Sequence, residues 1–199
     1  MFVTDQLVAA AIDEYGTPKQ VEFSVECTPD DFEFIRSTQK LDRAHDVTLH
    51  VLKGDRVIVN AKHFYPQGMF RAPSGGLEPG ERFEDGIARE LWEETGCRAE
   101  IQSFLMIAKV SFLRGETGRI ASRELVGSDP DRIDWTSYVF QLRYTTGEFD
   151  FTDKHEIREV ALVRLEDFGN YAKTMRLSTK GGLHYRAALH EAVAPLLRM

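Results

Sequence analysis

Cysteine is scarce in this chain: Cys27 and Cys97 are the only two among 199 residues. Two cysteines cannot build a disulfide framework, and neither lies in a motif typical of a catalytic thiol or a zinc ligand. The sequence also lacks an apolar run long enough to span a bilayer, and its first residues lack the basic start of a secretory leader. We therefore expect a cytoplasmic protein with no membrane partner.

Basic residues are in the minority as well. Lysine and arginine number 25 against 32 aspartates and glutamates, which gives a formal net charge of −7 at pH 7. Proteins that bind nucleic acid usually present an excess of positive charge to the phosphate backbone. The acidic balance argues against such a partner, whereas a small phosphate-rich molecule could still be bound through a metal ion and a few arginines.

Glycines mark both ends of one acidic stretch in the middle of the chain. Gly75, Gly76 and Gly80 predict a tight loop. Residues 83–95 then show helical periodicity, and Gly96 is placed to end the helix. The stretch is therefore predicted to be a loop followed by a helix.

Three glutamates of this helix, Glu90, Glu93 and Glu94, have the spacing i, i+3 and i+4. Like charges at this spacing repel one another by roughly 0.2–0.5 kcal/mol per pair. Glu93 and Glu94 also lie in the last turn, where the helix dipole disfavours negative charge. A divalent cation such as Mg²⁺, which prefers carboxylate and phosphate oxygens, would remove the conflict. A solvated acidic surface is the alternative.

Gly86 lies inside the same predicted helix. Glycine there costs about 0.8–1.0 kcal/mol relative to alanine, so its presence needs a reason. At about 100° per residue it projects close to Glu90 and Glu93. Either the missing side chain leaves room for a hydrated metal and a diphosphate, or the helix packs closely against a neighbouring segment at this point.

The whole stretch resembles the signature of the Nudix hydrolases. That signature reads Gly, five residues, Glu, seven residues, Arg-Glu-aliphatic, one residue, Glu-Glu, one residue, Gly, aliphatic. The matching positions here are Gly75, Glu81, Arg89, Glu90, Leu91, Glu93, Glu94, Gly96 and Cys97. The only departure is Cys97 in the aliphatic position, where a buried cysteine behaves as a small hydrophobic residue.

The resemblance implies an α/β/α sandwich with a mixed β-sheet and a Mg²⁺-dependent enzyme, with Mn²⁺ as a substitute. It also implies attack of water on the diphosphate of a nucleoside diphosphate linked to another moiety, such as a nucleotide sugar or an ADP-ribose-like compound. By their positions in the signature, Glu90, Glu93 and Glu94 should bind the metal, with the backbone carbonyl of Ser74 as a further ligand. Arg89 and Glu81 should pair and fix the loop against the helix.

Residues outside the signature are less specific. The family commonly uses one more acid as a base or extra ligand, for which we favour Glu156 over Glu116, Glu124, Asp150, Asp153 and Glu159; a solvated strand edge is the alternative. Arginine can hold phosphate oxygens in a bidentate manner and an aromatic ring can stack on a base. On that ground the substrate-binding candidates are Arg71, Arg114, Arg119 and Phe70, each of which could instead be a structural or surface residue.

The remaining elements predict an α/β fold in two parts. Residues 1–45 form an acidic extension that packs on the main domain or makes a homodimer contact, and residues 46–199 form the Nudix domain. The extension contains a helix before Gly16, a strand over 20–27 and a helix that begins at Pro29. The domain contains strands over 47–52, 56–61, 98–113 (one strand or two), 135–144 and 156–165, a loop over 115–134, a short helix from Glu166 and a last helix over 179–199.

Two other functions fit the same signature. A non-catalytic Nudix module that senses a ligand or binds a protein often lacks signature carboxylates, but this chain has kept all of them. A pyrophosphohydrolase that acts on RNA 5′ ends would share the chemistry, and the acidic charge balance counts against it.

Overall fold

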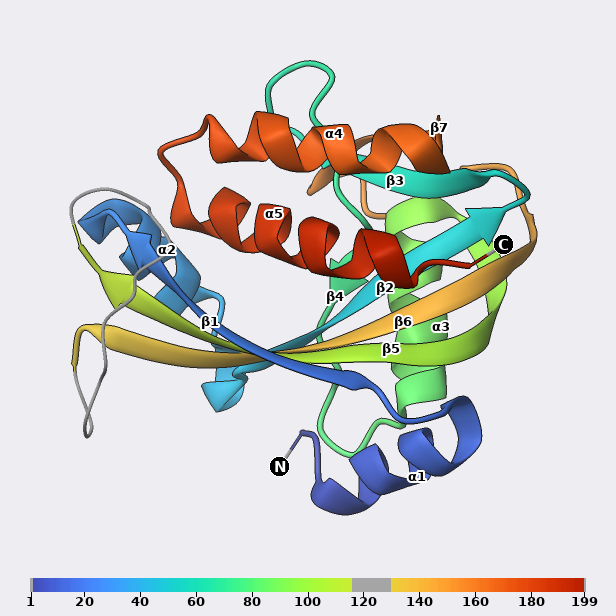
Figure 1. Ribbon diagram of the computed structural model, residues 1–199, viewed down its shortest axis with the longest axis horizontal. Coiled ribbons are helices and arrows are strands. Elements are labelled where there is room, and N and C mark those ends of the chain that lie inside the picture. Colours follow the sequence, from blue (N-terminus) through green and yellow to red (C-terminus); the bar gives the residue numbers. More distant parts are fainter. Residues whose placement is uncertain (1, 116–129, 199) are drawn as a thin grey trace.

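A mixed β-sheet of seven strands forms the centre of the computed structural model, which describes residues 2–115 and 130–198 (Figure 1). Helices cover both faces of the sheet. In chain order the elements are α1 (Asp5–Tyr15), β1 (Lys19–Cys27), α2 (Pro29–Ser37), β2 (His45–Lys53), β3 (Arg56–Lys62), β4 (Ser74–Gly75), α3 (Phe83–Thr95), β5 (Cys97–Arg114), β6 (Arg132–Gly147), β7 (Ile157–Arg164), α4 (Leu165–Arg176) and α5 (Gly181–Val193).

The strand order is β1-β5-β6-β2-β3-β7, and the short β4 pairs with β2 beside β3. The pairs β1/β5 and β2/β6 are parallel, and the other strand pairs are antiparallel. This mixed sheet between helical layers confirms the predicted fold class. Within the described residues, no helix combines the length and the apolar character that a bilayer crossing requires.

The central strand β2 is buried on both faces, and its side chains alternate between them as the period of two requires. Val47, Leu49 and Val51 enter the apolar cluster under α3. Thr48 and His50 point to the other face, where they contact Arg186 and His190 of α5. The face under α5 therefore carries buried polar groups, and the face under α3 is apolar.

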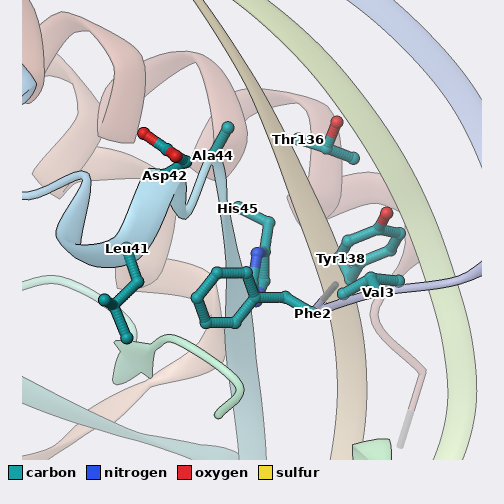
Figure 2. A pocket seen from close by; sticks show the side chains of 8 residues that line it. All are labelled: Phe2, Val3, Leu41, Asp42, Ala44, His45, Thr136 and Tyr138. Atoms are coloured by element: carbon teal, nitrogen blue, oxygen red, sulfur yellow. The ribbon is translucent and has the colours of Figure 1, made fainter. Parts of the chain in front are cut away.

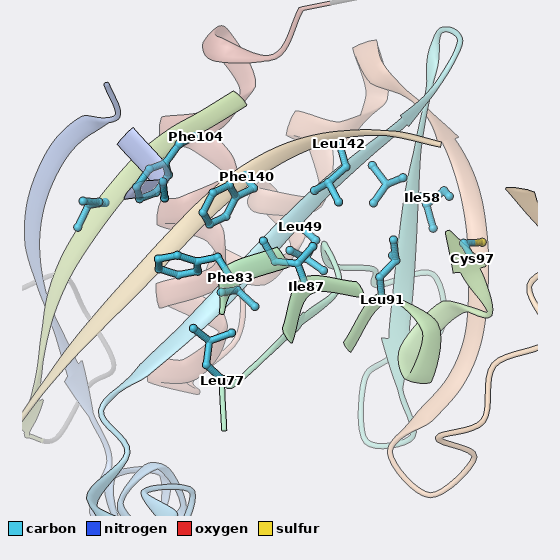
Figure 3. Packing of buried hydrophobic residues seen from close by; sticks show 14 residues of the cluster. Leu49, Ile58, Leu77, Phe83, Ile87, Leu91, Cys97, Phe104, Phe140 and Leu142 are labelled. Carbon is cyan, nitrogen blue, oxygen red and sulfur yellow. The ribbon is translucent and has the colours of Figure 1, made fainter. Parts of the chain in front are cut away.

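Three phenylalanine rings dominate the apolar face (Figure 3). Phe104 of β5 stacks on Phe140 of β6 with 4.5 Å between ring centroids. Phe83, the first residue of α3, packs against both rings. Ile87 and Leu91, one and two turns further on, are buried in the same cluster. This stripe fixes the rotation of α3 and turns its glutamates away from this apolar cluster.

Most predicted elements are present, with shifts at their ends. The stretch over 98–113, predicted to be one strand or two, forms one strand, β5. The last helix stops at Val193, because the following Pro195 sits in a short 3₁₀ turn. Of the predicted loop over 115–134, residues 116–129 lie outside the described part, and β6 begins at Arg132.

The N-terminal residues contribute directly to the sheet. β1 runs parallel to β5 over its full length and forms the sheet edge. Phe32 and Ile35 of α2 are buried in the cluster that α5 also enters. The division of the chain into an extension of residues 1–45 and a domain of residues 46–199 stays a prediction.

Candidate active site

The signature helix α3 is held at its C-terminal end by backbone groups. Gly96 adopts the left-handed conformation with φ of 67°, and its N–H donates to the carbonyl of Trp92. The carbonyl of Glu93 accepts hydrogen bonds from the N–H groups of Thr152 and Asp153. The segment after β6 therefore closes the end of the helix that carries the glutamates.

Arg89 and Glu81 form the predicted pair. Arg89 Nε donates to Glu81 Oε1 at 2.9 Å, and its Nη2 donates to Glu81 Oε2 at 2.8 Å. The same Nη2 donates to the carbonyl of Gly76 at 2.9 Å. The hydrogen bonds from Arg89 lower the pKa of Glu81. One guanidinium thus ties the loop to the helix.

Glu90 lies directly against the loop. An added Cβ at Gly75 would be 1.9 Å from Glu90 Cδ, so only glycine leaves space for this carboxylate. Glu90 Oε1 accepts from the Gly76 N–H at 3.1 Å and from Arg89 Nη1 at 2.9 Å. Burial raises the pKa of Glu90; Arg89 acts against this shift, and the charges of Glu94 and Glu93 add to it.

Glu94 lies deeper and has partners on both oxygens. Its Oε1 accepts from Arg71 Nη2 at 2.7 Å, and its Oε2 accepts from Asn60 Nδ2 and the Ser74 N–H, both at 2.8 Å. Only 4% of Glu94 and 1% of Arg71 is exposed. Asn60 was missed by the sequence analysis, because a buried asparagine on a strand has no signature of its own.

Glu93 is the most accessible of the three glutamates, with 44% of its side chain exposed. Its contact with Arg89 Nη1 is 3.5 Å long and therefore weak. No partner on Glu90 Oε2 is seen within the described residues. Hence Glu93 and Glu90 have carboxylate oxygens free for a further ligand.

The donor set fits a hard divalent cation, because it consists of carboxylates, and Glu90 is destabilised as an anion by burial and by its two neighbours. In residues 2–115 and 130–198, no three His, Cys, Asp or Glu side chains converge into a ready-made metal site. Arg71 pairs with Glu94, and Arg89 pairs with Glu90. Mg²⁺ normally keeps several waters and takes one or two carboxylates, which Glu90 and Glu93 can provide.

Glu156, the favoured acid outside the signature, lies just before β7 and forms an ion pair with Lys62 at the end of β3. Burial acts to raise the pKa of Glu156, but the hydrogen bond and charge of Lys62 and the charge of Arg71 keep it below its usual value. The charge of Glu94 in turn acts to raise the pKa of Lys62, which burial lowers. Glu156 therefore shares the electrostatic environment of the signature carboxylates.

The other candidate acids are occupied or not described. Glu159 pairs with Arg158, and Asp150 pairs with Lys154. Asp153 caps the turn before β7 by accepting from the Glu156 N–H. Glu116 and Glu124 lie outside the described residues.

The structure does not bring the substrate-binding candidates together. Arg71 is buried and bonded within the protein, so its predicted contact with substrate does not fit its position. Arg114, at the distal end of β5, pairs with Glu33 and Asp131. Phe70 packs edge-to-face on Tyr171 of α4. Arg119 lies outside the described residues, and a metal contact by the Ser74 carbonyl stays a prediction.

Gly86 is explained by packing. An added Cβ would be 2.2 Å from Leu77 Cδ2 and 2.8 Å from Glu81 Oε2. Leu77 is almost fully buried. The space beside Gly86 is thus filled by the signature loop, and the suggestion that it admits the metal and diphosphate is corrected to the close-packing alternative.

A cavity of about 400 Å³ adjoins the signature loop (Figure 2), lined by Phe2, Val3, Leu41, Asp42, Ala44, His45, Thr136 and Tyr138. Burial lowers the pKa of His45 to about 4, so its ring is neutral near pH 7. Its Nε2 accepts a hydrogen bond from the Leu77 N–H at 3.2 Å. His45, the first residue of β2, thereby links the lining of this cavity to the signature loop.

The family described as "NUDIX domain" matches residues 42–181. The chain is 35% identical over 116 residues to nucleoside triphosphatase NudI of Klebsiella pneumoniae subsp. pneumoniae, which covers 55% of this chain and 75% of that protein. It is 35% identical over 81 residues to phosphatase NudJ of Escherichia coli strain K12, which covers 36% of this chain and about half, 53%, of that protein.

A solved NUDIX hydrolase from Nitrosomonas europaea superposes with a TM-score of 0.50 at 13% identity. The match covers 79% of this chain and 97% of that chain. At this identity the likeness shows a common fold.

Proposed function

The chain belongs to the Nudix hydrolase family, and from this premise we propose that it is a Mg²⁺-dependent pyrophosphohydrolase. Its proposed substrate is a nucleoside diphosphate linked to another moiety. The observation that carries the proposal is the pair of carboxylates with free oxygens, Glu90 and Glu93, placed beside a loop that Arg89 and Glu81 hold in position. A module that only binds its ligand does not need this arrangement.

Each signature residue has a proposed role. Glu90 and Glu93 would hold the cation, with Glu94 contributing the unused acceptor site of its Oε1. A bound Mg²⁺ would neutralise charge on the diphosphate and lower the pKa of a bound water. Arg89 keeps the Gly76 carbonyl and the Glu90 carboxylate fixed, which preserves the aim of the ligands.

Glu156 is proposed as the base. The charge of Lys62 favours its ionised form, so Glu156 can accept a proton at neutral pH. Lys62, the ion-pair partner of Glu156, also feels the charge of Glu94, and this shared partner supports the role. A change of Glu156 to glutamine should then lower kcat more than it changes KM.

Nucleoside triphosphates are a second candidate substrate class. The relative that shares 35% identity over three quarters of its own length is named a nucleoside triphosphatase. The phosphoanhydride chemistry would be the same, and only the group that leaves would differ.

A panel of nucleoside diphosphate compounds and nucleoside triphosphates tests the proposal, with Mg²⁺ or Mn²⁺ and detection of phosphate products. Glu93→Gln keeps the side-chain shape, and we expect turnover to fall by roughly 10²- to 10³-fold. Apo thermal stability should stay level or rise, because one like charge leaves the cluster. Glu100→Gln, an exposed glutamate that pairs with Arg143, is the control.

Retention of wild-type turnover in Glu93→Gln would refute its metal role. Binding without any product across the panel would instead favour the sensing or protein-binding module. Turnover of RNA alone, with release of pyrophosphate from a 5′-triphosphate end or of the cap nucleotide from a capped end, would favour the enzyme that acts on RNA 5′ ends.

A further inference from the structure

Arg43 differs from the other arginines that are not on the surface. Among the arginines that residues 2–115 and 130–198 include, those that are wholly or partly buried pair with a carboxylate, except Arg43. Its Nε is buried and has no partner in this part of the chain. Its guanidinium makes one long hydrogen bond, 3.4 Å from Nη2 to the carbonyl of Thr38. A partly buried cation without an anion is costly, so the protein keeps it for a reason other than stability.

The Arg43 guanidinium packs on the signature loop. An added Cβ at Gly76 would be 1.9 Å from Arg43 Nη1 and 2.5 Å from its Cζ, so the glycine leaves room for this side chain. The N–H of Gly76 donates to Glu90 Oε1, and its carbonyl accepts from Arg89. Arg43 therefore contacts the residue that also contacts a proposed metal carboxylate.

The backbone before Arg43 is strained. Leu41 and Asp42 have φ values of 53° and 60°, a left-handed conformation that non-glycine residues rarely adopt. Figure 2 shows both residues on the turn that leads through Ala44 into β2. Leu41 is 81% exposed, so burial of its side chain does not hold this turn. The consequence of the turn is the position of Arg43 over Gly76.

We propose that Arg43 binds the phosphoryl oxygens of the substrate's diphosphate, where it lies against Gly76, the loop residue whose N–H donates to Glu90. A guanidinium has five N–H donors in a planar fork that suits phosphate, and most of those of Arg43 are unused. The phosphate supplies the anion that the protein does not. The inference rests on the proposed function, since it assigns the diphosphate of that substrate to a residue outside the signature.

The test compares Arg43→Ala and Arg43→Lys with wild type. Arg56→Ala, which removes an exposed arginine at the start of β3, is the control for net charge. The measurements are KM and kcat for a compound that the panel identifies, the Kd of inorganic pyrophosphate by calorimetry with and without Mg²⁺, and the apo Tm. For Arg43→Ala we expect KM and the pyrophosphate Kd to rise by roughly tenfold or more, with kcat changed less. Its Tm should stay level or rise, because an unpaired cation is lost.

Arg43→Lys keeps the charge without the fork and should give intermediate values, and it carries the test if Arg43→Ala does not fold. Gly76→Ala should displace Arg43 and raise the same Kd, with no further loss in the double variant. An unchanged pyrophosphate Kd, or a fall in Tm alone, overturns the inference. The wild-type protein could bind pyrophosphate and yet turn over no compound. If Arg43→Ala then loses pyrophosphate binding, the proposed function fails and the phosphate site stands.

Discussion

Two groups of buried titratable residues in this protein are treated in opposite ways. In the signature region, Arg71 and Glu94 are charged, and each bonds to the other. Under α5, His50 and His190 are fully buried; His50 meets Phe168 edge-to-face and His190 stacks on Phe168, with little hydrogen bonding. Both nitrogens of His50 and Nδ1 of His190 have no partner within the described residues. Burial lowers the pKa of His50 to about 3, and burial also lowers that of His190.

The two regions meet at residues 71 and 72, because the Ala72 N–H donates to His190 Nε2 at 3.3 Å. The Arg71–Glu94 side of this junction keeps its charges, whereas the His50–His190 side is neutral. A buried charge is tolerated only with partners, whereas a neutral imidazole can pack as an aromatic ring. The difference teaches that the polar face of the sheet is divided into charged centres, such as the pairs Arg71–Glu94 and Asp46–Arg186, and a neutral pocket around His50 and His190.

Removing one partner of the ion pair between Arg71 and Glu94 should have the largest effect on stability. Arg71→Met leaves Glu94 buried without its counter-ion, and we expect a loss of about 3–5 kcal/mol in the free energy of unfolding. Urea unfolding at pH 7 measures it. Adding Glu94→Gln to Arg71→Met should restore part of the loss; if the double variant is less stable than Arg71→Met, the ion pair is not the cause.

Lowering the pH should protonate the buried histidines His50 and His190 as the protein unfolds. The folded pKa values of His50 and His190 lie below the unfolded value near 6.5, so the unfolded state binds more protons as pH falls. Their contribution to stability is complete above about pH 6.5 and should fall by about 1.4 kcal/mol per pH unit for each histidine below it. Unfolding free energies between pH 7 and 5 test this.

His50→Phe fits an aromatic site and should flatten that pH dependence, whereas His155→Asn, at an exposed position, should leave it unchanged. An identical slope in His50→Phe and wild type would show that His50 is not a source of the acid sensitivity.

The signature region could be predicted from the sequence to a large extent, because its information is local. Helix α3 has the predicted bounds, and the pair Arg89 and Glu81 is made within one motif. The side-chain partners of Glu94 come from β3 and from the segment before β4, and no local spacing links Asn60 or Arg71 to the helix. The same limit explains why Arg71 was placed at the substrate.

Elements outside the motif also were predicted where the information is local and were not predicted where it depends on distant contacts. The hydrophobic alternation predicted the strand over 20–27, but not that it would pair in parallel with β5 at the sheet edge. The neutral histidines of the face under α5 were not foreseen either, since His50 and His190 are 140 residues apart and their rings meet only in the fold.

A double-mutant cycle on Arg89 and Glu81 tests whether the paired charges work as a unit. Each single change to alanine should lower activity through the loop position, and the double change should cost much the same as either one. We expect a coupling energy of about 1–2 kcal/mol, within the range for residues in one ion-pair network. Kinetics of the four proteins gives this value, and additive losses would argue that each residue acts alone.

The smallest expected change in stability distinguishes close packing from a substrate-binding role at Gly86. An added Cβ there would overlap Leu77, which is buried, so Gly86→Ala should lower stability by about 1 kcal/mol after the better helix propensity of alanine is counted. Gly169 in α4 is the matched control, because nothing lies within 4 Å of its added Cβ. Gly169→Ala should raise stability by up to about 1 kcal/mol. Opposite signs in thermal unfolding would support close packing of α3 on its loop; a stabilised Gly86→Ala with lost activity would return Gly86 to the binding site.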